Sequence, residues 1–195
     1  PGELSTRLSQ LLRRGILLVV VLTILLSRYA MSATVYRPVQ GGITINRLTI
    51  IGWNIRITAN DLSPAMIAKA RNGVYSPHSL RTTPPDILAR YFTKEPEGYK
   101  IHPKVQKLVS FGMINLNDTQ TVKRVAKSHV VFCRNVIIYF DDPMKQKVIG
   151  GFYDNLIPGG YLTLGHSESI HKLSTAFKLI LNPGSIFYKK QDEKV

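Results

Sequence analysis

Three groups of residues that could do chemistry come at the ends of predicted strands. They are Asp61 after a strand over 54–59, Asn115 and Leu116 at the end of a strand piece over 113–116, and Arg134 with Asn135 after a strand over 130–133. In an open α/β sheet, ligands bind beyond the carboxyl ends of the strands. A carboxylate there can accept hydrogen bonds from both hydroxyls of a ribose. An amide beside an apolar side chain could hold an adenine, so these residues favour a ribose at Asp61 and allow an adenine next to it.

Each group also has an ordinary structural interpretation. Asp61 precedes a predicted helix, which its carboxylate could simply help to cap. Asn115 is a residue type that is common in turns. Arg134 and Asn135 must reach the crevice or water, because buried without partners they would cost several kcal/mol. Tyr139, which follows them, could equally pack in the core.

Other reactive residues do not form a complete site. Cys133 could be a nucleophile with His129 or His166, but no third group that would orient the histidine is evident. A lone cysteine at the end of an apolar strand usually belongs to the core. His166 and Glu168 could be catalytic or could shape the rim of the crevice. Gly41–Gly42 has the position of a dinucleotide-binding loop, but a segment with poor helix propensity follows it. No Cys/His cluster has the spacing of metal ligands, so we expect no metal.

The elements that would position these residues alternate between strand and helix. A helix is predicted over Pro64–Asn72, with Ser63 as its N-cap and Gly73 after its last residue. The further predicted elements are strand pieces over 108–111 and 113–116, a helix over 143–156, a turn at 158–160, and strands over 161–164, 177–181 and 185–189. The alternation predicts a parallel α/β sheet that ends in an antiparallel pair around residues 182–184.

Composition places the chain among globular proteins and leaves its partner open. Of the 195 residues, 44% are hydrophobic and 19% are charged, with a formal net charge of +14. Such a charge attracts nucleic acid, anionic lipid or an acidic protein, or belongs to a basic enzyme with scattered lysines. No basic run is interleaved with aromatic residues, so we expect no nucleic acid partner. A single cysteine, Cys133, fits a reducing compartment, and we expect a cytoplasmic protein.

Residues 1–52 follow a different pattern from residues 53–195, which we interpret as one domain. The first 60 residues hold seven arginines and no lysine, whereas residues 61–195 hold fourteen lysines and five arginines. Ile16–Leu26 is an apolar run with arginines on both sides, too short to cross a bilayer as a helix. It has the outline of a secretory signal or membrane anchor, but we favour a buried helix or an ill-formed segment, since Arg28 follows directly after the run. We expect no stable membrane insertion and predict no fold for residues 1–52.

The consecutive motifs of the later segment resemble the C-terminal domain of CheR-type chemoreceptor methyltransferases. The matching strings are DLSPAMIAKARNGVYS (61–76), LARYF (88–92), INL (114–116), VVFCRNVIIYFDD (130–142) and PGGYLTLGHSES (158–169). The resemblance runs from about Trp53 to Tyr188. It implies a Rossmann-like methyltransferase sheet, mostly parallel with a C-terminal antiparallel hairpin. It also implies a small β-subdomain at about residues 90–112.

By this resemblance the candidate residues surround S-adenosylmethionine, which leaves as S-adenosylhomocysteine. Asp61 would bind the ribose, Asn115 and Leu116 would line the adenine pocket, and Arg134 with Asn135 would complete the cofactor site. Tyr139 would be catalytic: it would lie beside the methyl group and help to place the incoming carboxylate. No metal is needed.

The resemblance implies O-methylation of glutamate side chains on chemoreceptors, carried out by a monomer. A glutamate carboxylate is already ionised at neutral pH, so no strong general base is required. A basic surface suits an acidic receptor. One alternative is an impaired relative that only binds a receptor or another acidic protein. A weaker one is a basic protein that associates with membranes or nucleic acid.

One family motif is not recognisable. A strand, a glycine-containing loop with acidic residues and a helix should precede the strand over 54–59. Between Glu3 and Asp61 the sequence has no acidic residue. Because that loop wraps the methionine part of the cofactor in the family, the segment before Trp53 departs from it where the cofactor would be held.

Overall fold

The computed structural model describes residues 32–35, 57–125, 127–165, 167–170, 173–182 and 185–191. The strands of the larger sheet are β1 (Ser32–Val35), β2 (Ile57–Asp61), β6 (Val109–Met113), β7 (Ser128–Cys133), β8 (Leu156–Leu164), β9 (Phe177–Asn182) and β10 (Ser185–Lys190). Those of the smaller sheet are β3 (Val74–Tyr75), β4 (Phe92–Glu95) and β5 (Gly98–Ile101). The helices are α2 (Pro64–Asn72), α3 (Pro85–Tyr91), α4 (Pro103–Gln106), α5 (Thr119–Arg124) and α6 (Asp142–Asn155), with 3-10 turns η1 (Pro77–Leu80) and η2 (Ile137–Tyr139).

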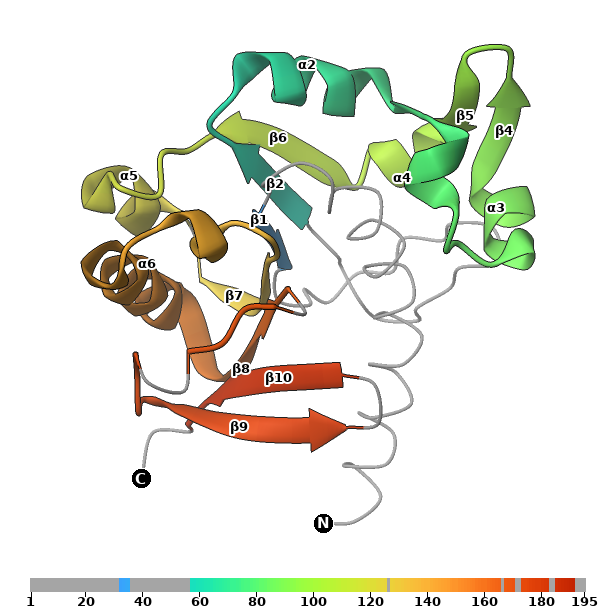
Figure 1. Ribbon diagram of the computed structural model, residues 1–195. Helices are drawn as coiled ribbons and strands as arrows, with labels where there is room; N and C mark the ends of the chain where they lie inside the picture. The colour runs from blue at the N-terminus through green and yellow to red at the C-terminus, as the bar shows by residue number, and fades with distance from the viewer. Residues whose placement is uncertain are drawn as a thin grey trace, which may run out of the picture.

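The larger sheet has seven strands in the order β6-β2-β1-β7-β8-β10-β9 (Figure 1). β2 is parallel to β6, and β7 is parallel to β8, whereas β1 is antiparallel to both of its neighbours and β10 is antiparallel to β8 and β9. All of its strands except β1 and β10 therefore run in one direction. This confirms the predicted Rossmann-like fold class, a mostly parallel sheet that ends in an antiparallel hairpin.

The sequence predicts no strand at Ser32–Val35, where the structure has β1. β1 lies between β2 and β7, where Ser32 pairs with Asn60 and Cys133, and Val35 pairs with Ile57. Its first residue therefore lies at the edge where β2 and β7 end, and its last residue lies at the opposite edge. A strand that leads directly into a loop at the ligand edge would have to run the other way. The apolar run at 16–26 and Gly41–Gly42 lie outside the described residues.

Helix α2 forms as the sequence predicts, with the same bounds. The Ser63 side chain accepts a hydrogen bond from the N–H of Met66 at 3.4 Å, and Pro64 occupies the first helical turn. Gly73 ends the helix in the left-handed region, at φ 67°, and its N–H donates to the carbonyl of Lys69. A residue with a Cβ would be strained at this φ, which is why glycine is favoured there.

Two details of the predicted strands are wrong. The pieces at 108–111 and 113–116 form a single strand, β6, and residues after Met113 leave the sheet. Continuous pairing with β2 depends on Gly112, where a Cβ would lie 2.8 Å from Oδ1 of Asn60. Pro158–Gly160, expected to be a turn before a strand, lies inside β8, and the register with β7 shifts there. The long strand absorbs this break because β7 continues beside it on both sides.

The smaller sheet has the order β3-β5-β4, so it takes one strand from residues 74–75. The strand at 109–113 belongs to the larger sheet instead. In Figure 1 the β4–β5 hairpin projects beside α3 and α4, away from α5, α6 and the β9–β10 hairpin. It is joined to the main sheet through β3 and α2 on one side and through α4 and β6 on the other.

The core has two parts, because each face of the larger sheet is covered separately. One cluster joins Ile57 and Ala59 of β2 to α2 and to the smaller sheet. The other joins Val131, Cys133 and Leu162 to the buried face of α6. Alternate residues of a strand point to opposite faces, so β7 contributes Phe132 to the first cluster and its neighbours to the second. No helix in the described part of the chain is long and apolar enough to span a bilayer.

Lys190 fixes the C-terminal end of α6 from the neighbouring hairpin. Its Nζ donates to the carbonyls of Tyr153 at 2.8 Å and Leu156 at 2.9 Å, and lies 4.3 Å from the centroid of the Tyr153 ring. We expect Lys190→Met to lower the free energy of unfolding by about 1–3 kcal/mol, because carbonyls at a helix end lose a charged donor. Urea denaturation measures this. A change below about 0.5 kcal/mol, as for an ordinary surface substitution, would contradict it.

Candidate functional site

The predicted site residues follow one row of paired residues across the sheet. Asn60, Ser32, Cys133 and Leu164 are consecutive partners in β2, β1, β7 and β8. At the same edge, Asp61 ends β2, and Arg134 and Gly165 directly follow β7 and β8. Neighbouring strands lie about 4.8 Å apart, so Asp61 and Arg134, which are separated by β1, lie about 10 Å apart.

Asp61 is buried, and one oxygen of its carboxylate has no partner among the described residues. The side chain is 6% exposed. Oδ1 accepts a hydrogen bond from the N–H of Ser63 at 2.7 Å, while Oδ2 is buried and unpaired. The helix itself is capped by Ser63, so Asp61 only holds the capping residue in place. A buried carboxylate oxygen without a donor is costly, and it is suited to a ligand hydroxyl that brings the missing donor.

Asn115 and Leu116 lie in the turn that follows β6, close to Asp61. The N–H of Ile114 donates to the carbonyl of Asp61 at 3.1 Å, which joins the ends of β2 and β6. Oδ1 of Asn115 accepts from the N–H of Asn117 at 2.9 Å, so the turn interpretation holds for this oxygen. Leu116 is half-buried and reaches toward α5 and α6.

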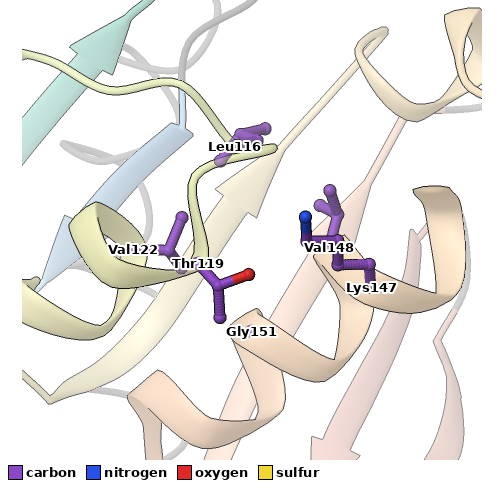
Figure 2. A pocket seen from close by; sticks show the side chains of 6 residues that line it. All are labelled: Leu116, Thr119, Val122, Lys147, Val148 and Gly151. Atoms are coloured by element: carbon purple, nitrogen blue, oxygen red, sulfur yellow. The ribbon is translucent and has the colours of Figure 1, made fainter.

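Figure 2 shows the small cavity below this turn, between α5 and α6. Its lining comprises Leu116, Thr119, Val122, Lys147, Val148 and Gly151. A second small cavity shares Leu116 and Val122 and reaches the side chains of Asn60 and Asn155. Leu116 therefore packs against the helix layer while it lies within the turn that the N–H of Asp118 closes on the carbonyl of Asn115.

The segment after β7 brings Arg134, Asn135 and Tyr139 to the same edge. Arg134 is half-buried, and Asn135 is exposed with a positive φ of 58°. Tyr139 lies in η2 and is 78% exposed, so the interpretation of this residue as core packing is wrong. Its ring can meet a ligand without displacing any part of the core.

Glu168 contributes to this edge in a way that the sequence alone did not indicate. The residue is 8% exposed, not at the rim, and its carboxylate accepts five backbone hydrogen bonds. The donors belong to Gly165 and to the consecutive residues 135–138. An acidic residue shortly after a buried strand is the sequence signal that could have identified Glu168 as part of this edge. His166, beside it, lies outside the described residues.

Cys133 is not available as a nucleophile. It is completely buried, and burial first, then the nearby charge of Glu168, raises the pKa of its thiol. Only a thiolate attacks. His129 lies four residues earlier in the same strand, about 13 Å away along it, so the two do not form a pair.

We expect native protein at pH 8 to react with Ellman's reagent at least 100-fold more slowly than protein in 8 M urea, because the buried Cys133 thiol stays protonated. The absorbance of the released thiolate measures both rates. Equal rates would show that the end of β7 is open to solvent.

Large apolar side chains are also exposed at this edge. Leu62, Met113 and Ile138 are 63%, 58% and 45% exposed, and each follows or ends a strand at this edge. Large exposed apolar residues grouped around unpaired polar atoms mark binding surfaces. In the described residues no group of three His, Cys, Asp or Glu side chains is arranged to hold a metal ion. The edge thus combines a buried carboxylate oxygen that has no described partner with exposed apolar side chains.

Comparison with known proteins gives a consistent result. Residues 43–184 match the family described as CheR methyltransferase, SAM binding domain. The chain is 35% identical over 147 residues to chemotaxis protein methyltransferase 2 of Vibrio cholerae, covering 72% of this chain and 51% of that protein. It is 39% identical over 140 residues to the chemotaxis protein methyltransferase of Vibrio parahaemolyticus, covering 70% and 50%.

A third relative, chemotaxis protein methyltransferase 1 of Pseudomonas aeruginosa, is 35% identical over 139 residues, covering 70% of this chain and 50% of that protein. The chain thus spans about half the length of these relatives. The matched region contains β2, β6, β7 and β8 with every candidate site residue, and excludes β1. On this match, the chain belongs to the CheR methyltransferase family, in its SAM-binding domain.

Proposed function

We propose that this chain transfers a methyl group from S-adenosylmethionine to the side-chain carboxylate of glutamate residues on a chemoreceptor. The observation that supports this is a buried carboxylate oxygen of Asp61 at the carboxyl edge of the sheet, without a partner among the described residues, in a member of this family. A ribose offers two adjacent hydroxyls, and Oδ2 of Asp61 lacks one donor. The residues present therefore fit the adenosine part of the cofactor.

In this proposal each candidate residue has a separate task. Asp61 accepts a hydrogen bond from the ribose, and Asn115 and Leu116 provide an amide and an apolar face for the adenine. Arg134 and Asn135 complete the site on the other side of β1. These contacts would keep the cofactor in place while water is excluded from the reacting atoms.

The transfer itself requires position more than acid–base chemistry. When bound, S-adenosylmethionine supplies a methyl group on a positively charged sulfur. The glutamate carboxylate, ionised at neutral pH, forms the new oxygen–carbon bond as the sulfur–carbon bond breaks and its electron pair returns to sulfur. Tyr139 borders the site and would orient the incoming carboxylate. Holding the two reactants in line can lower the barrier by about 7–11 kcal/mol.

The chain fits the methionine part of S-adenosylmethionine less well than the adenosine part. β1 runs antiparallel to β2 and β7, so its last residue, Val35, lies at the edge of the sheet opposite Asp61. The resemblance places the methionine-binding loop after a strand that precedes the strand over 54–59, and no acidic residue stands between Glu3 and Asp61. We infer that the adenosine half supplies most of the binding energy here. S-adenosylhomocysteine and 5′-methylthioadenosine should therefore bind with affinities within about 10-fold of each other. A difference of that size corresponds to at most one hydrogen bond to a charged group.

Isothermal titration calorimetry of the whole chain with S-adenosylmethionine and S-adenosylhomocysteine tests the cofactor site. A second assay with tritiated methyl donor and the cytoplasmic part of a chemoreceptor tests the transfer. We expect saturable binding and base-labile label in the receptor, because a methyl ester hydrolyses in base. A folded protein that binds neither compound would contradict the proposal.

Tyr139→Ala should separate transfer from binding. Because the ring is 78% exposed, its removal should change the free energy of unfolding by less than about 0.5 kcal/mol. We expect kcat to fall by about 10-fold or more, since the carboxylate loses an orienting group. Steady-state assays with the receptor measure this. The control is Leu181→Ala, which removes a side chain of similar exposure, 69%, from β9. Equal kcat values for both variants would remove Tyr139 from the site.

The partner and setting follow from the same proposal. A formal charge of +14 suits association with an acidic receptor surface, and such association should weaken as salt is raised. The protein would act as a monomer in the cytoplasm. The single free cysteine, which is buried, is compatible with that reducing compartment.

A further inference from the structure

The carboxylate of Glu168 joins the loops that follow two neighbouring strands. Oε2 accepts from the N–H of Asn135 at 2.8 Å and from that of Gly165 at 2.6 Å. Oε1 accepts from the N–H groups of Val136, Ile137 and Ile138 at 2.8, 2.9 and 3.3 Å. Gly165 follows β8, and the other donors follow β7. One side chain therefore fixes the relative position of both loops.

These donors point to one place because of the local backbone. Asn135 has a φ of 58°, in the left-handed region, which turns its N–H to the same side as those that follow. The next N–H groups begin η2, so they have no partner within that short turn. Successive N–H groups arranged around such a turn form a concave site for an anion. In this protein the anion is a side chain of the chain itself.

The Glu168 carboxylate is packed so closely that no Cβ fits at Gly165. A Cβ on Gly165 would lie 2.6 Å from Oε2 of Glu168 and 2.7 Å from Oδ1 of Asn135. These distances are shorter than any ordinary contact, so the glycine permits the close approach of the two loops. The carboxylate is also only 8% exposed. Both of its oxygens are committed to the backbone, which makes it unsuited to act as a general base on a substrate.

We propose that Glu168 is a positioning residue: its carboxylate holds the segment from Arg134 to Tyr139 in the shape that binds the cofactor and presents the tyrosine. This rests on the function proposed above. The two oxygens divide the task. Oε2 fixes Asn135, beside Arg134, and Oε1 fixes the first residues of η2, which carries Tyr139.

Glu168→Gln tests this division because it changes one oxygen and keeps the size. The amide oxygen can still accept from Val136, Ile137 and Ile138. The amide NH2 then replaces Oε2 and meets the N–H groups of Asn135 and Gly165, donor against donor. The opposite orientation of the amide would set the NH2 against three N–H groups, which is worse. The substitution should therefore release the Arg134–Asn135 side and retain the η2 side.

Three measurements follow for Glu168→Gln against the unaltered protein. In NMR-detected hydrogen exchange without ligand, the amides of Asn135 and Gly165 should exchange at least 10-fold faster, and those of Val136 and Ile137 should change much less. In calorimetry, the affinity for S-adenosylhomocysteine should fall about 10-fold, as for one lost hydrogen bond to a charged group. In the transfer assay, KM for the donor should rise while kcat changes by less than about 2-fold.

The control for a merely structural effect is Lys190→Met. It lowers stability at the opposite edge of the sheet, where its partner Leu156 begins β8, and should leave the affinity unchanged. Gly165→Ala is a second test, because its Cβ displaces the carboxylate without removing the charge; it should weaken affinity as Glu168→Gln does. Equal affinity losses in Glu168→Gln and in Lys190→Met, or unchanged exchange at Asn135 and Gly165, would overturn the inference.

If the unaltered protein binds no S-adenosylhomocysteine, the proposed function fails, and the exchange rates still decide whether Glu168 holds the two loops.

Discussion

Asp61→Asn is expected to weaken the binding of S-adenosylhomocysteine by about 10- to 100-fold, which corresponds to the loss of one or two hydrogen bonds to a charged acceptor. The substitution keeps the size of the side chain. It also keeps an oxygen that can accept from the N–H of Ser63, so the start of α2 is preserved. What changes is Oδ2, the buried atom without a partner, which becomes an NH2 group that cannot accept from a ribose.

The same substitution should not destabilise the protein. One oxygen of the buried carboxylate has no partner among the described residues, so removal of its charge relieves a desolvation cost. We expect the free energy of unfolding to stay within about 0.5 kcal/mol of the original value or to rise. Calorimetry and urea denaturation on the same sample separate the two effects.

Asp118→Asn is the matched control for Asp61→Asn. Asp118 also stands before a helix, where Oδ1 accepts from the N–H groups of Gln120 and Thr121, but it is exposed. Its substitution should leave the affinity within about 2-fold, because it has no buried free oxygen to offer a ligand. An affinity for S-adenosylhomocysteine that is equally unchanged in Asp61→Asn would refute the ribose assignment.

Phe152→Ala should cause the largest loss of stability, about 3–5 kcal/mol. Phe152 lies on the buried face of α6, is 4% exposed and belongs to the cluster beneath β7 and β8. Its ring also lines the cavity that extends to Asn60. Removal would enlarge that space, and the surrounding strands cannot collapse into it because they are held in the sheet. A typical domain has only about 5–15 kcal/mol in total.

Urea denaturation of Phe152→Ala, followed by circular dichroism, gives the change directly. Gln146→Ala is the control, since Gln146 lies on the exposed side of the same helix; it should change the free energy of unfolding by less than about 0.5 kcal/mol. A loss below about 1 kcal/mol for Phe152→Ala would mean that α6 does not pack on the sheet as described.

Local signals in the sequence were sufficient for the elements that carry the site. Ser63, Pro64 and Gly73 set the ends of α2 because capping depends on residues within one turn of the helix ends. The apolar segment at 130–133 was a strand because its composition requires burial on both faces. The edge at which Asp61, Arg134 and Tyr139 lie followed from the alternation of strands and helices. The roles of these residues in cofactor binding stay predictions.

The sequence was less informative where the structure depends on partners far along the chain. The break at Pro158–Gly160 predicts a turn when read locally, yet the strand continues because β7 pairs on both sides of it. The smaller sheet takes β3 from residues 74–75, which are more than twenty residues before β5, its partner. Neither pairing has a local signal, because strand pairing is decided by which segments the whole fold brings side by side.

The sequence alone predicted the α/β fold class, the ends of α2 and the family motifs, because these depend on short-range periodicity and on a few residue types. Only the tertiary structure decided the direction of β1, the unpaired oxygen of Asp61 and the commitment of the Glu168 carboxylate to five N–H groups. Direction and hydrogen-bond partners are set between segments that are distant in the chain. The type of a residue fixes which hydrogen bonds its side chain can donate or accept, and the fold determines which partners are within reach.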